Sequence, residues 1–256
     1  GNVITCGSGG SRVVAEFLNL VLSKKNHAIV QTVEPRDLNY LNLGLFQNLI
    51  VVSHSGSNYG VKSSLNKNIH RYLLSTRKTK VYREILLHYD MENRHSFISL
   101  NATLVPMAIL LKYYVGDSFL GLIEEMFLHI EKNMWLETDH IVNIFSGIDT
   151  HTVETFLEST FVEAGMGIPL IHHKYDYCHG RSTCNKKHEH AAIYLENKER
   201  DLDKTIKQVL ENSMKDYIVI KGFSEDEVVN QFYMTLQAMY LCVNIAKGKK
   251  IDLANV

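Results

Sequence analysis

The chain has 256 residues, of which 45% are hydrophobic and 21% charged, and its formal net charge at pH 7 is -1. This length suffices for one large domain or two small ones with a complete hydrophobic core. The near-neutral charge argues against a nucleic-acid-binding protein, which needs a strong local excess of Lys and Arg.

Cysteine usage and hydropathy restrict the compartment. The cysteines are widely spaced and form no secreted disulfide framework, which indicates a reducing environment. No signal peptide precedes the first predicted strand, and no continuous apolar run reaches the roughly 18 residues of a membrane span. We therefore expect a soluble, cytoplasmic protein without membrane attachment.

The first predicted elements form a glycine-rich junction. The chain begins with the apolar run VITC, continues with GSGGS, and then enters RVVAEFLNLVLSKKN, whose apolar residues recur at helical spacing. A strand, a glycine turn and a helix in this order direct free backbone N–H groups and a positive dipole end at an anion. The alternative is structural, because Gly7, Gly9 and Gly10 also permit close packing of the strand on the helix.

A second polar turn follows the third predicted strand. After the strand HAIVQTVEP comes the strand NLIVVSHSGSNYG, and then a predicted helix that contains VKSSLNKNI. Ser53, Ser55, Ser57 and Asn58 place short donors beside a glycine at a helix start, which suits a phosphate monoester better than a bulky nucleotide. Ordinary N-capping by Ser or Asn is the alternative.

The remainder of the first half is less regular. The segment KVYREILLHY fits a strand or a short helix, and SLNATLVPMAILLKYY predicts a long apolar helix. Pro106 within that helix predicts a kink or an early boundary. Together these elements predict that residues 1-117 form one doubly wound α/β subdomain.

The second half repeats the plan. After the amphipathic SFLGLIEEMFLHIEKNMW come a strand in DHIVNIF, a glycine-bearing turn, a helix, and a strand in GIPLIHHKYDY that extends towards His179. HAAIYLENK and DYIVIKG predict strands, RDLDKTIKQVLENSMK a helix, and EDEVVNQFYMTLQAMYLCVNIAKG the last helix. We predict an α/β fold of two similar doubly wound subdomains, residues 1-117 and 118-256, with parallel sheets flanked by helices and a site at their shared edge.

Two side chains of the second half are candidates for proton transfer. Glu163 ends a helical pattern, and His179 follows sixteen positions later in the turn-like segment YDYCHGR. A carboxylate, an imidazole and two phosphate-binding turns together indicate chemistry on a phosphorylated sugar. Taken singly, Glu163 is as readily a solvated or capping residue and His179 a structural one.

A cluster of cysteines and histidines raises the question of zinc. The cluster consists of Cys178, His179, Cys184, His188 and His190. Its C-x5-C-x3-H-x-H spacing is not a standard structural zinc pattern, so we expect no metal site and no cofactor.

With these pieces in place, the chain resembles the sugar isomerase (SIS) domain family over nearly its whole length, in particular the paired SIS domains of glucosamine 6-phosphate synthase and related isomerases and deaminases. The glycine turn is similar to the family's first glycine-serine loop. Ser53-His54-Ser55-Gly56-Ser57-Asn58 is similar to its Ser-x-Ser-Gly-x-Thr phosphate loop, and the segment FISLNAT to a segment that touches substrate. The resemblance implies a phosphate and substrate site formed by Gly9, Gly10, Ser11, Ser53, His54, Ser55, Asn58 and Ser99.

The second half resembles the family at its catalytic motif. Glu163 and His179 match the family's catalytic Glu and the His of its Glu-x-x-His-Gly-Pro motif in type and separation, with Asp176 in place of that Glu and Arg181 in place of the Pro. Arg181 is a candidate contact for a carboxylate or phosphate of the substrate, because a guanidinium pairs bidentately with such groups. An ion pair between Arg181 and Asp176 is the alternative.

The sequence also departs from the family pattern. Thr160 stands where amidotransferase members carry a Lys, Arg94 where the substrate segment opens with Glu, and the chain ends at Val256 before their tail Lys. We expect no glutaminase domain, which argues against synthesis of glucosamine 6-phosphate from glutamine. The family usually has a helix before its first strand, so we expect a chain that starts at Gly1 to be trimmed or incomplete.

The resemblance implies an aldose–ketose isomerase or an amino-sugar-phosphate deaminase or deglycase that works through an enediol. In that mechanism Glu163 is the base at C1 and C2, and His179 is the acid and base that opens the ring. A sugar phosphate is then the ligand, and a homodimer the assembly. The alternatives are a sugar-phosphate-binding regulatory module that has lost turnover and a structural dimerisation unit.

Overall fold

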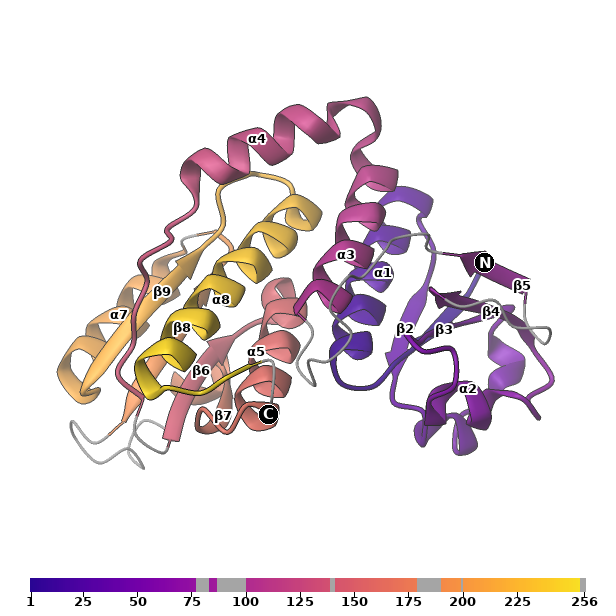
Figure 1. Ribbon diagram of the computed structural model, residues 1–256, viewed down its shortest axis with the longest axis horizontal. Coiled ribbons are helices and arrows are strands. Elements are labelled where there is room, and N and C mark those ends of the chain that lie inside the picture. The colour runs from indigo at the N-terminus through magenta and orange to yellow at the C-terminus, as the bar shows by residue number, and fades with distance from the viewer. Residues whose placement is uncertain (77–82, 87–99, 139–140, 179–189, 199, 254–256) are drawn as a thin grey trace. The chain divides into compact units, whose positions relative to one another are not determined.

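The computed structural model describes residues 1–76, 83–86, 100–138, 141–178, 190–198 and 200–253 (Figure 1). The chain divides into two compact units. Unit 1 comprises Gly1–Arg94 and Ser99–Phe119, and unit 2 comprises His95–Ile98 and Leu120–Val256. Each unit contains one parallel sheet flanked by helices, which confirms the predicted α/β class with two such subdomains. The boundary at residue 117 stays a prediction.

The sheet of unit 1 has the strand order β2-β1-β3-β4-β5, and every pair in it is parallel. Its strands are β1 (Val3–Cys6), β2 (Val30–Val33), β3 (Asn48–Val52), β4 (His70–Ser75) and β5 (Arg83–Leu86). The chain leaves β1 towards β2 on one side and later returns to β3 on the other side. The strand order therefore reverses between β1 and β3, at the position where open α/β sheets bind ligands.

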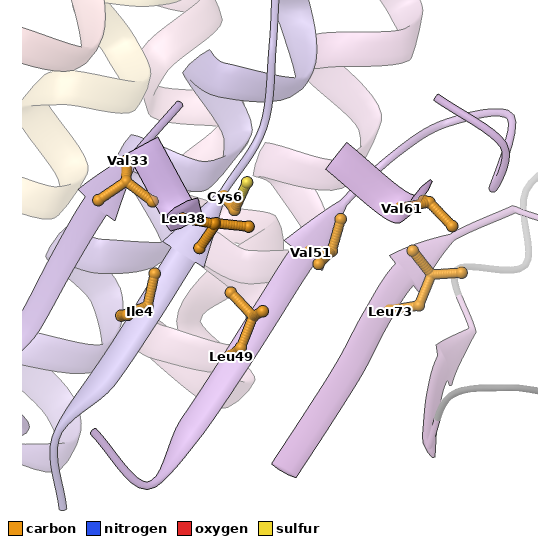
Figure 2. Packing of buried hydrophobic residues seen from close by; sticks show 8 residues of the cluster. All are labelled: Ile4, Cys6, Val33, Leu38, Leu49, Val51, Val61 and Leu73. Atoms are coloured by element: carbon orange, nitrogen blue, oxygen red, sulfur yellow. The ribbon is translucent and has the colours of Figure 1, made fainter. Parts of the chain in front are cut away.

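The two central strands of unit 1 are apolar on both faces, as parallel strands covered by helices require. One face packs into a cluster with residues from the connecting segments (Figure 2). Its buried members are Ile4, Cys6, Val33, Leu38, Leu49, Val51, Val61 and Leu73. Alternate residues of β1 and β3 belong to this cluster because successive side chains of a strand point to opposite faces.

The two long helices of unit 1, α1 and α3, pack against each other. The helix α1 (Gly10–Asn26) contacts β1, β2, β3 and the helix α3 (Leu100–Val115) (Figure 1). Lys25 Nζ donates to the carbonyl oxygens of Tyr113 at 2.6 Å and Tyr114 at 2.9 Å, which ties the ends of both helices together. The helix α3 continues through Pro106 to Val115, so the predicted early boundary at Pro106 is wrong.

The segment after the serine-rich turn differs from the prediction. Instead of a helix through VKSSLNKNI, the helix α2 covers only Tyr59–Ser64, and the unpredicted strand β4 follows. Ser64 Oγ donates to the carbonyl of Val61 at 2.8 Å, a local bond that competes with helix continuation. The ambiguous segment KVYREILLHY contains the strand β5. Short 3-10 turns complete this unit at Asp37–Asn39 (η1), Leu43–Leu45 (η2) and Gly116–Ser118 (η3).

The sheet of unit 2 has the order β7-β6-β8-β9, and all its pairs are parallel. The strands are β6 (Ile141–Ser146), β7 (Ile168–His173), β8 (Ala191–Glu196) and β9 (Asp216–Lys221). The strand order reverses between β6 and β8. The helices are α4 (Phe119–His129), α5 (His151–Glu163), α6 (Lys174–Cys178), α7 (Asp201–Ser213) and α8 (Glu227–Lys249), with the 3-10 turn η4 at Ile148–Thr150.

Helices cover both faces of the second sheet. The helices α5 and α8 contact each other, and α7 lies on the opposite side of the sheet from α8 (Figure 1). On the side of α7, Phe145 and Tyr194 of the sheet pack with Tyr177 of α6 and with Ile206 and Leu210 of α7. The residues Lys174–Cys178 were predicted to extend a strand, but they form α6, which caps this cluster with the buried Tyr177.

One helical stretch, Ala102–His129, is long and apolar enough to span a membrane by length and composition. The stretch contains Lys112 and Asp117, so it is not the continuous apolar run that the sequence analysis excluded. The stretch is divided at Gly116, where a positive φ of 66° starts η3, into α3 with 16 residues and α4 with 11. Each part is shorter than the roughly 20 residues that a spanning helix needs.

Candidate functional site

Both predicted phosphate loops of unit 1 lie at the carboxyl edge of its sheet. The glycine turn follows β1, and the serine-rich turn follows β3, so the two turns border the position where the strand order reverses. Ligands of open α/β sheets bind in the crevice outside this position. The sheet topology thus brings together two segments that are about forty residues apart in the sequence.

In the serine-rich loop, Ser53 has an unusual environment. Its side chain is fully buried, and its Oγ has no hydrogen-bond partner among the described residues. The neighbouring hydroxyls are arranged by contacts within the loop. Ser55 Oγ accepts from Ser57 N at 3.3 Å and lies 3.1 Å from Ser57 Oγ, and Gly56 between them has a positive φ of 65°. The loop therefore presents hydroxyls that local hydrogen bonds do not saturate.

Two other members of this loop hold its shape. The carbonyl of His54 accepts from Ser75 Oγ at 3.2 Å and Thr76 Oγ1 at 2.9 Å, which fastens the loop to the end of β4. Asn58 is the N-cap of α2, where its Oδ1 accepts from Val61 N at 3.1 Å. The capping alternative for Asn58 is therefore what the structure contains, with its amide N–H groups left for other contacts.

The glycine turn is tightly packed. Gly9 precedes α1 with a positive φ of 55°, a conformation that glycine adopts without steric cost. A Cβ atom on Gly10 would lie 2.7 Å from Thr103 Oγ1 of α3, and one on Gly7 would lie 2.3 Å from the carbonyl oxygen of Ser11. The packing alternative accounts for Gly7 and Gly10, and Ser11 lies in the first turn of α1.

Glu163 lies at the amino-terminal edge of the sheet of unit 2, opposite its carboxyl edge. Helix α5 follows β6 and returns towards the start of β7, so its last residue, Glu163, is at the amino-terminal edge of that sheet. Glu163 Oε1 accepts a hydrogen bond from Ser159 Oγ at 2.6 Å. The remaining predicted site residues, Ser99, His179 and Arg181, lie outside the described residues.

The proposed zinc ligands also fall largely outside the part of the chain that the structure describes, which excludes residues 179–189. Among the described residues, no group of three or more His, Cys, Asp or Glu side chains is placed to hold a metal ion. Cys6 and Cys242 are free and buried. Burial, with Asp37 and Glu34 nearby, raises the pKa of the Cys6 thiol to about 12, so this thiol stays protonated near neutral pH.

Unit 2 contains a pocket that the sequence did not predict. It has a volume of about 280 Å³ and lies at the carboxyl ends of β6, β7 and β8. The lining residues are Ser146, Gly147, Ile148, Asp149, His173, Lys174, Tyr175, Lys198, Arg200, Leu202 and Asp203. The available sequence signal was the polar or glycine-bearing turn after each of these strands, which by itself does not distinguish a pocket from a solvated loop.

Ser146, which lines the pocket, contacts the buried carboxylate of Glu154. Ser146 Oγ donates to Glu154, whose other oxygen is 3.4 Å from His151 Nδ1. Burial favours a raised pKa for Glu154, but the hydrogen bonds from His151 and Ser146 and the charges of His151 and His173 outweigh it and lower that pKa below its usual value. Glu154 is thus a charged and partnered structural group.

Comparison with known proteins rests on structure alone. No family model matches the sequence, and no curated protein matches it. Tagatose-6-phosphate ketose/aldose isomerase from Escherichia coli has a similar structure, with a TM-score of 0.74 and 14% identity over 100% of this chain and 84% of that chain. Glucosamine-6-phosphate deaminase from Thermotoga maritima has a TM-score of 0.72 and 13% identity over 99% of this chain and 87% of that chain.

A third similar structure is the C-terminal domain of glucosamine-fructose-6-phosphate aminotransferase from Francisella tularensis, with a TM-score of 0.72 and 12% identity over 98% of this chain and 86% of that chain. The TM-scores establish the fold, and at such low identities they establish the fold alone. The chain therefore has the paired sugar isomerase (SIS) fold that its sequence resembles.

Proposed function

We propose that the protein binds a sugar phosphate at the Ser53–Asn58 loop of unit 1 and catalyses either its aldose–ketose isomerisation or the deamination or deglycation of an amino-sugar phosphate. The observation that carries the proposal is the buried hydroxyl of Ser53, which has no hydrogen-bond partner in the described part of the chain. A buried hydroxyl without a partner costs roughly 1–3 kcal/mol. A phosphate oxygen in this loop would accept from that hydroxyl and remove the cost on binding.

The surrounding loop supports the same ligand. Ser55 and Ser57 add hydroxyl donors, and the glycine turn with Gly9, Gly10 and Ser11 follows the neighbouring strand β1. The charge of a phosphate is well served by several neutral donors, since hydrogen bonds to an ionised acceptor are about twice as strong as neutral ones. The similar solved structures are named for activities on hexose 6-phosphates, which supports this class of ligand.

The proposed chemistry uses Glu163 and His179. Moving a proton between C1 and C2 of an open-chain sugar phosphate produces an enediol, and a carboxylate such as Glu163 is a suitable base for this transfer. Ring opening needs a proton transfer between O5 and O1, which an imidazole such as His179 performs near neutral pH. Ser159 donates to Glu163 and thereby holds the carboxylate in one orientation. Ser99 and Arg181 are proposed to contact the substrate.

The binding part of the proposal is tested by calorimetric titration with glucosamine 6-phosphate, tagatose 6-phosphate and fructose 6-phosphate. Replacing Ser53 by Ala is expected to weaken binding about tenfold or more, because a hydrogen bond to an ionised group is lost. Ser23→Ala is the matched control, since Ser23 Oγ donates to Asn19 within α1 and lies outside the loop. Unchanged affinity in both Ser53→Ala and Ser55→Ala rejects this binding site.

The catalytic part is tested by exchange of the C2 proton with deuterated water, followed by NMR. Wild-type protein is expected to exchange this proton in the sugar phosphate that it binds, and Glu163→Gln to abolish exchange while binding persists. Full exchange in Glu163→Gln contradicts the role of Glu163. Binding without exchange in the wild-type protein favours the regulatory alternative, a sugar-phosphate-binding module without turnover.

We further propose that the protein is a homodimer. Helix α4 exposes Leu120 at 72%, Phe127 at 46% and Leu128 at 84%, an apolar group of the kind that protein interfaces cover. Sedimentation analysis is expected to give twice the mass of the chain, and Leu128→Glu to shift the protein towards monomer. A monomeric wild-type protein at micromolar concentration contradicts the dimer. The cytoplasmic location remains a prediction.

A further inference from the structure

The pocket of unit 2 occupies the position that corresponds to the serine-rich loop of unit 1. In unit 1 the order β2-β1-β3 reverses after the central strand β1, and in unit 2 the order β7-β6-β8 reverses after β6. The segment after β8 therefore corresponds to the Ser53–Asn58 loop after β3. This segment contributes Lys198 and Arg200 to the pocket wall, where unit 1 has neutral hydroxyls.

We propose that this pocket is a second binding site, separate from the Ser53 loop, for a small polyhydroxylated molecule that carries a phosphate group. Arg200 and Lys198 bind the phosphate, and Lys174 contributes the third positive charge. The proposal concerns unit 2 alone and does not depend on binding at unit 1.

The segment after β8 is anchored so that its cationic side chains remain at the pocket. Glu196 at the end of β8 is buried and accepts from Lys207 Nζ at 2.7 Å, and Asn197 Oδ1 accepts from Asn230 Nδ2 of α8 at 2.6 Å. These bonds tie the end of β8 to α7 through Glu196 and to α8 through Asn197. The side chains of Lys198 and Arg200 stay accessible, at 42% and 64% exposure, and Lys198 Nζ also pairs with the exposed carboxylate of Glu225, which lies outside the pocket lining.

Lys174, the third cation, is held in place by contacts within unit 2. Lys174 has a side-chain exposure of only 11%, its Nζ lies 3.0 Å from Asp203 Oδ1, and it stands 4.6 Å above the ring centroid of Tyr194. Asp203 also accepts from Tyr194 Oη and from the backbone N–H of Arg200 at 2.7 Å. Because these donors already occupy the carboxylate of Asp203, it offers little to a ligand, whereas the ammonium of Lys174 retains further N–H donors.

Among the residues that line the pocket, positively charged side chains outnumber negatively charged ones. The pocket is lined by the cations Lys174, Lys198 and Arg200 and by the carboxylates Asp149 and Asp203. Arg200 Nη2 lies 3.5 Å from Asp149 Oδ2, too far for a strong hydrogen bond, so most of its five donors remain for a ligand. Arg is the side chain best suited to bind a phosphate bidentately.

The helix that follows β6 does not supply the anion contacts. The backbone N–H of Thr152, in the first turn of α5, donates to Gln231 Oε1 of α8 at 2.9 Å, and Glu154 in the same turn is negative. No residue of α5 is in the pocket lining, so the proposed anion is bound chiefly by the cationic side chains. This arrangement differs from a backbone phosphate cradle and predicts a strong dependence on Arg200.

The volume of the pocket and its other polar side chains indicate what the ligand carries besides the phosphate group. A volume of about 280 Å³ is at the low end for ligand pockets, which are roughly 300–1,000 Å³. It suits one monosaccharide or a short polyol and is small for a nucleotide. Asp149 and Tyr175 are placed on the lining to accept from or donate to hydroxyl groups, which a simple inorganic anion lacks.

The test is a calorimetric titration of the full chain with glucosamine 6-phosphate, tagatose 6-phosphate and inorganic phosphate. It compares the wild-type protein with four variants, Arg200→Ala, Arg200→Lys, Lys204→Ala and Ser53→Ala. Arg200→Ala is expected to weaken one class of sites for a hexose 6-phosphate about tenfold, with partial rescue by Arg200→Lys. Lys204→Ala is the matched control, because Lys204 is an exposed cation of α7 that is absent from the pocket lining. Far-UV circular dichroism verifies that each variant is folded.

The outcomes separate this proposal from the proposed function. Binding that Arg200→Ala weakens and Ser53→Ala leaves intact supports the second site, even if the Ser53 loop binds nothing. Binding that only Ser53→Ala weakens, or no binding of either hexose 6-phosphate, overturns it. Inorganic phosphate that binds as tightly as both sugar phosphates contradicts the polyol part, because the hydroxyl groups then add no affinity.

Discussion

The two units place opposite kinds of chemistry at corresponding strand ends. In unit 1 the strand β3 ends in Ser53, whose buried hydroxyl has no partner among the described residues. In unit 2 the corresponding strand β8 ends in Glu196, which is buried but paired with Lys207, and the segment after it carries exposed cations. The same backbone topology thus supports one strand end with a buried neutral hydroxyl and another with a paired carboxylate and exposed cations.

The stability of the two units therefore depends on different interactions. A loop with unsatisfied donors gains free energy only when a ligand accepts from them, so its residues can be replaced with little effect on folding. A network of buried ion pairs contributes rigidity only while every member is present. Variants that remove one member from each loop therefore distinguish a binding role from a structural role.

The largest effect is expected from Asp203→Asn in unit 2. The substitution leaves Lys174 largely buried without its carboxylate, and breaking such a pair typically costs about 3–5 kcal/mol of unfolding free energy. Urea unfolding followed by the fluorescence of Trp135, the single tryptophan of the chain, reports on unit 2. Asp201→Asn is the control, since Asp201 is fully exposed. A loss below 1 kcal/mol would show that Lys174 is not held by this pair.

The next effect concerns the glycine turn of unit 1. In Gly10→Ala the new Cβ meets Thr103 Oγ1 at 2.7 Å, and forcing α1 away from α3 is expected to cost about 1–3 kcal/mol. Gly121→Ala in α4 is the control, because a Cβ there meets nothing within 4 Å. Thermal unfolding followed by far-UV circular dichroism measures both variants. A Gly10→Ala protein as stable as the wild type contradicts the packing role of this turn.

A matched pair of serine variants compares the two units directly. Ser146→Ala removes a hydrogen bond to the buried Glu154 and is expected to lower the unfolding free energy by about 1–3 kcal/mol. Ser53→Ala removes a hydroxyl that has no partner among the described residues and is expected to leave stability unchanged or slightly raised. Urea unfolding of both variants measures the two changes in unfolding free energy. Equal losses in both would mean that Ser53 has a structural role.

The smallest effect is a dependence on pH that belongs to unit 2. The pKa of Asp203 is lowered, because hydrogen bonds from Tyr194 and Lys174 outweigh the opposing effect of burial, and the pKa of Glu154 is lowered as well. A lowered folded-state pKa means that the unfolded chain binds protons first as the pH falls. The stability from both groups is therefore complete above their usual values, 4.5 for Glu and 3.8 for Asp, and is lost as the pH falls below them.

Measuring the unfolding free energy of unit 2 by Trp135 fluorescence between pH 7 and pH 3 tests this dependence. We expect the wild-type protein to lose stability towards pH 3, and Asp203→Asn to show a shallower slope because one titrating group is gone. Identical slopes in the two proteins would contradict the assignment to Asp203.

Much of the fold could be predicted from local patterns. Runs such as VITC and NLIVV are continuous and apolar, as buried parallel strands are, and each precedes a turn and a helix with 3.6-residue periodicity. The strand β4 was missed because its sequence, HRYLLS, mixes polar and apolar residues at no clear period. The helix α6 was predicted as strand because KYDYC is too short to show helical periodicity, and the buried Tyr177 shows its packing only in three dimensions.

The α/β class, the glycine and serine turns and the resemblance to the SIS fold could be read from the sequence, because these depend on residue types at short, regular spacing. Which polar groups are satisfied depends on contacts between distant parts of the chain. Thr152 meets Gln231, Asn197 meets Asn230 and Lys174 meets Asp203, each across many residues of chain. Periodicity carries no information about such pairs. For the same reason only the folded chain distinguishes Ser53, buried and without a partner among the residues that the structure describes, from Ser146, buried and bonded to Glu154.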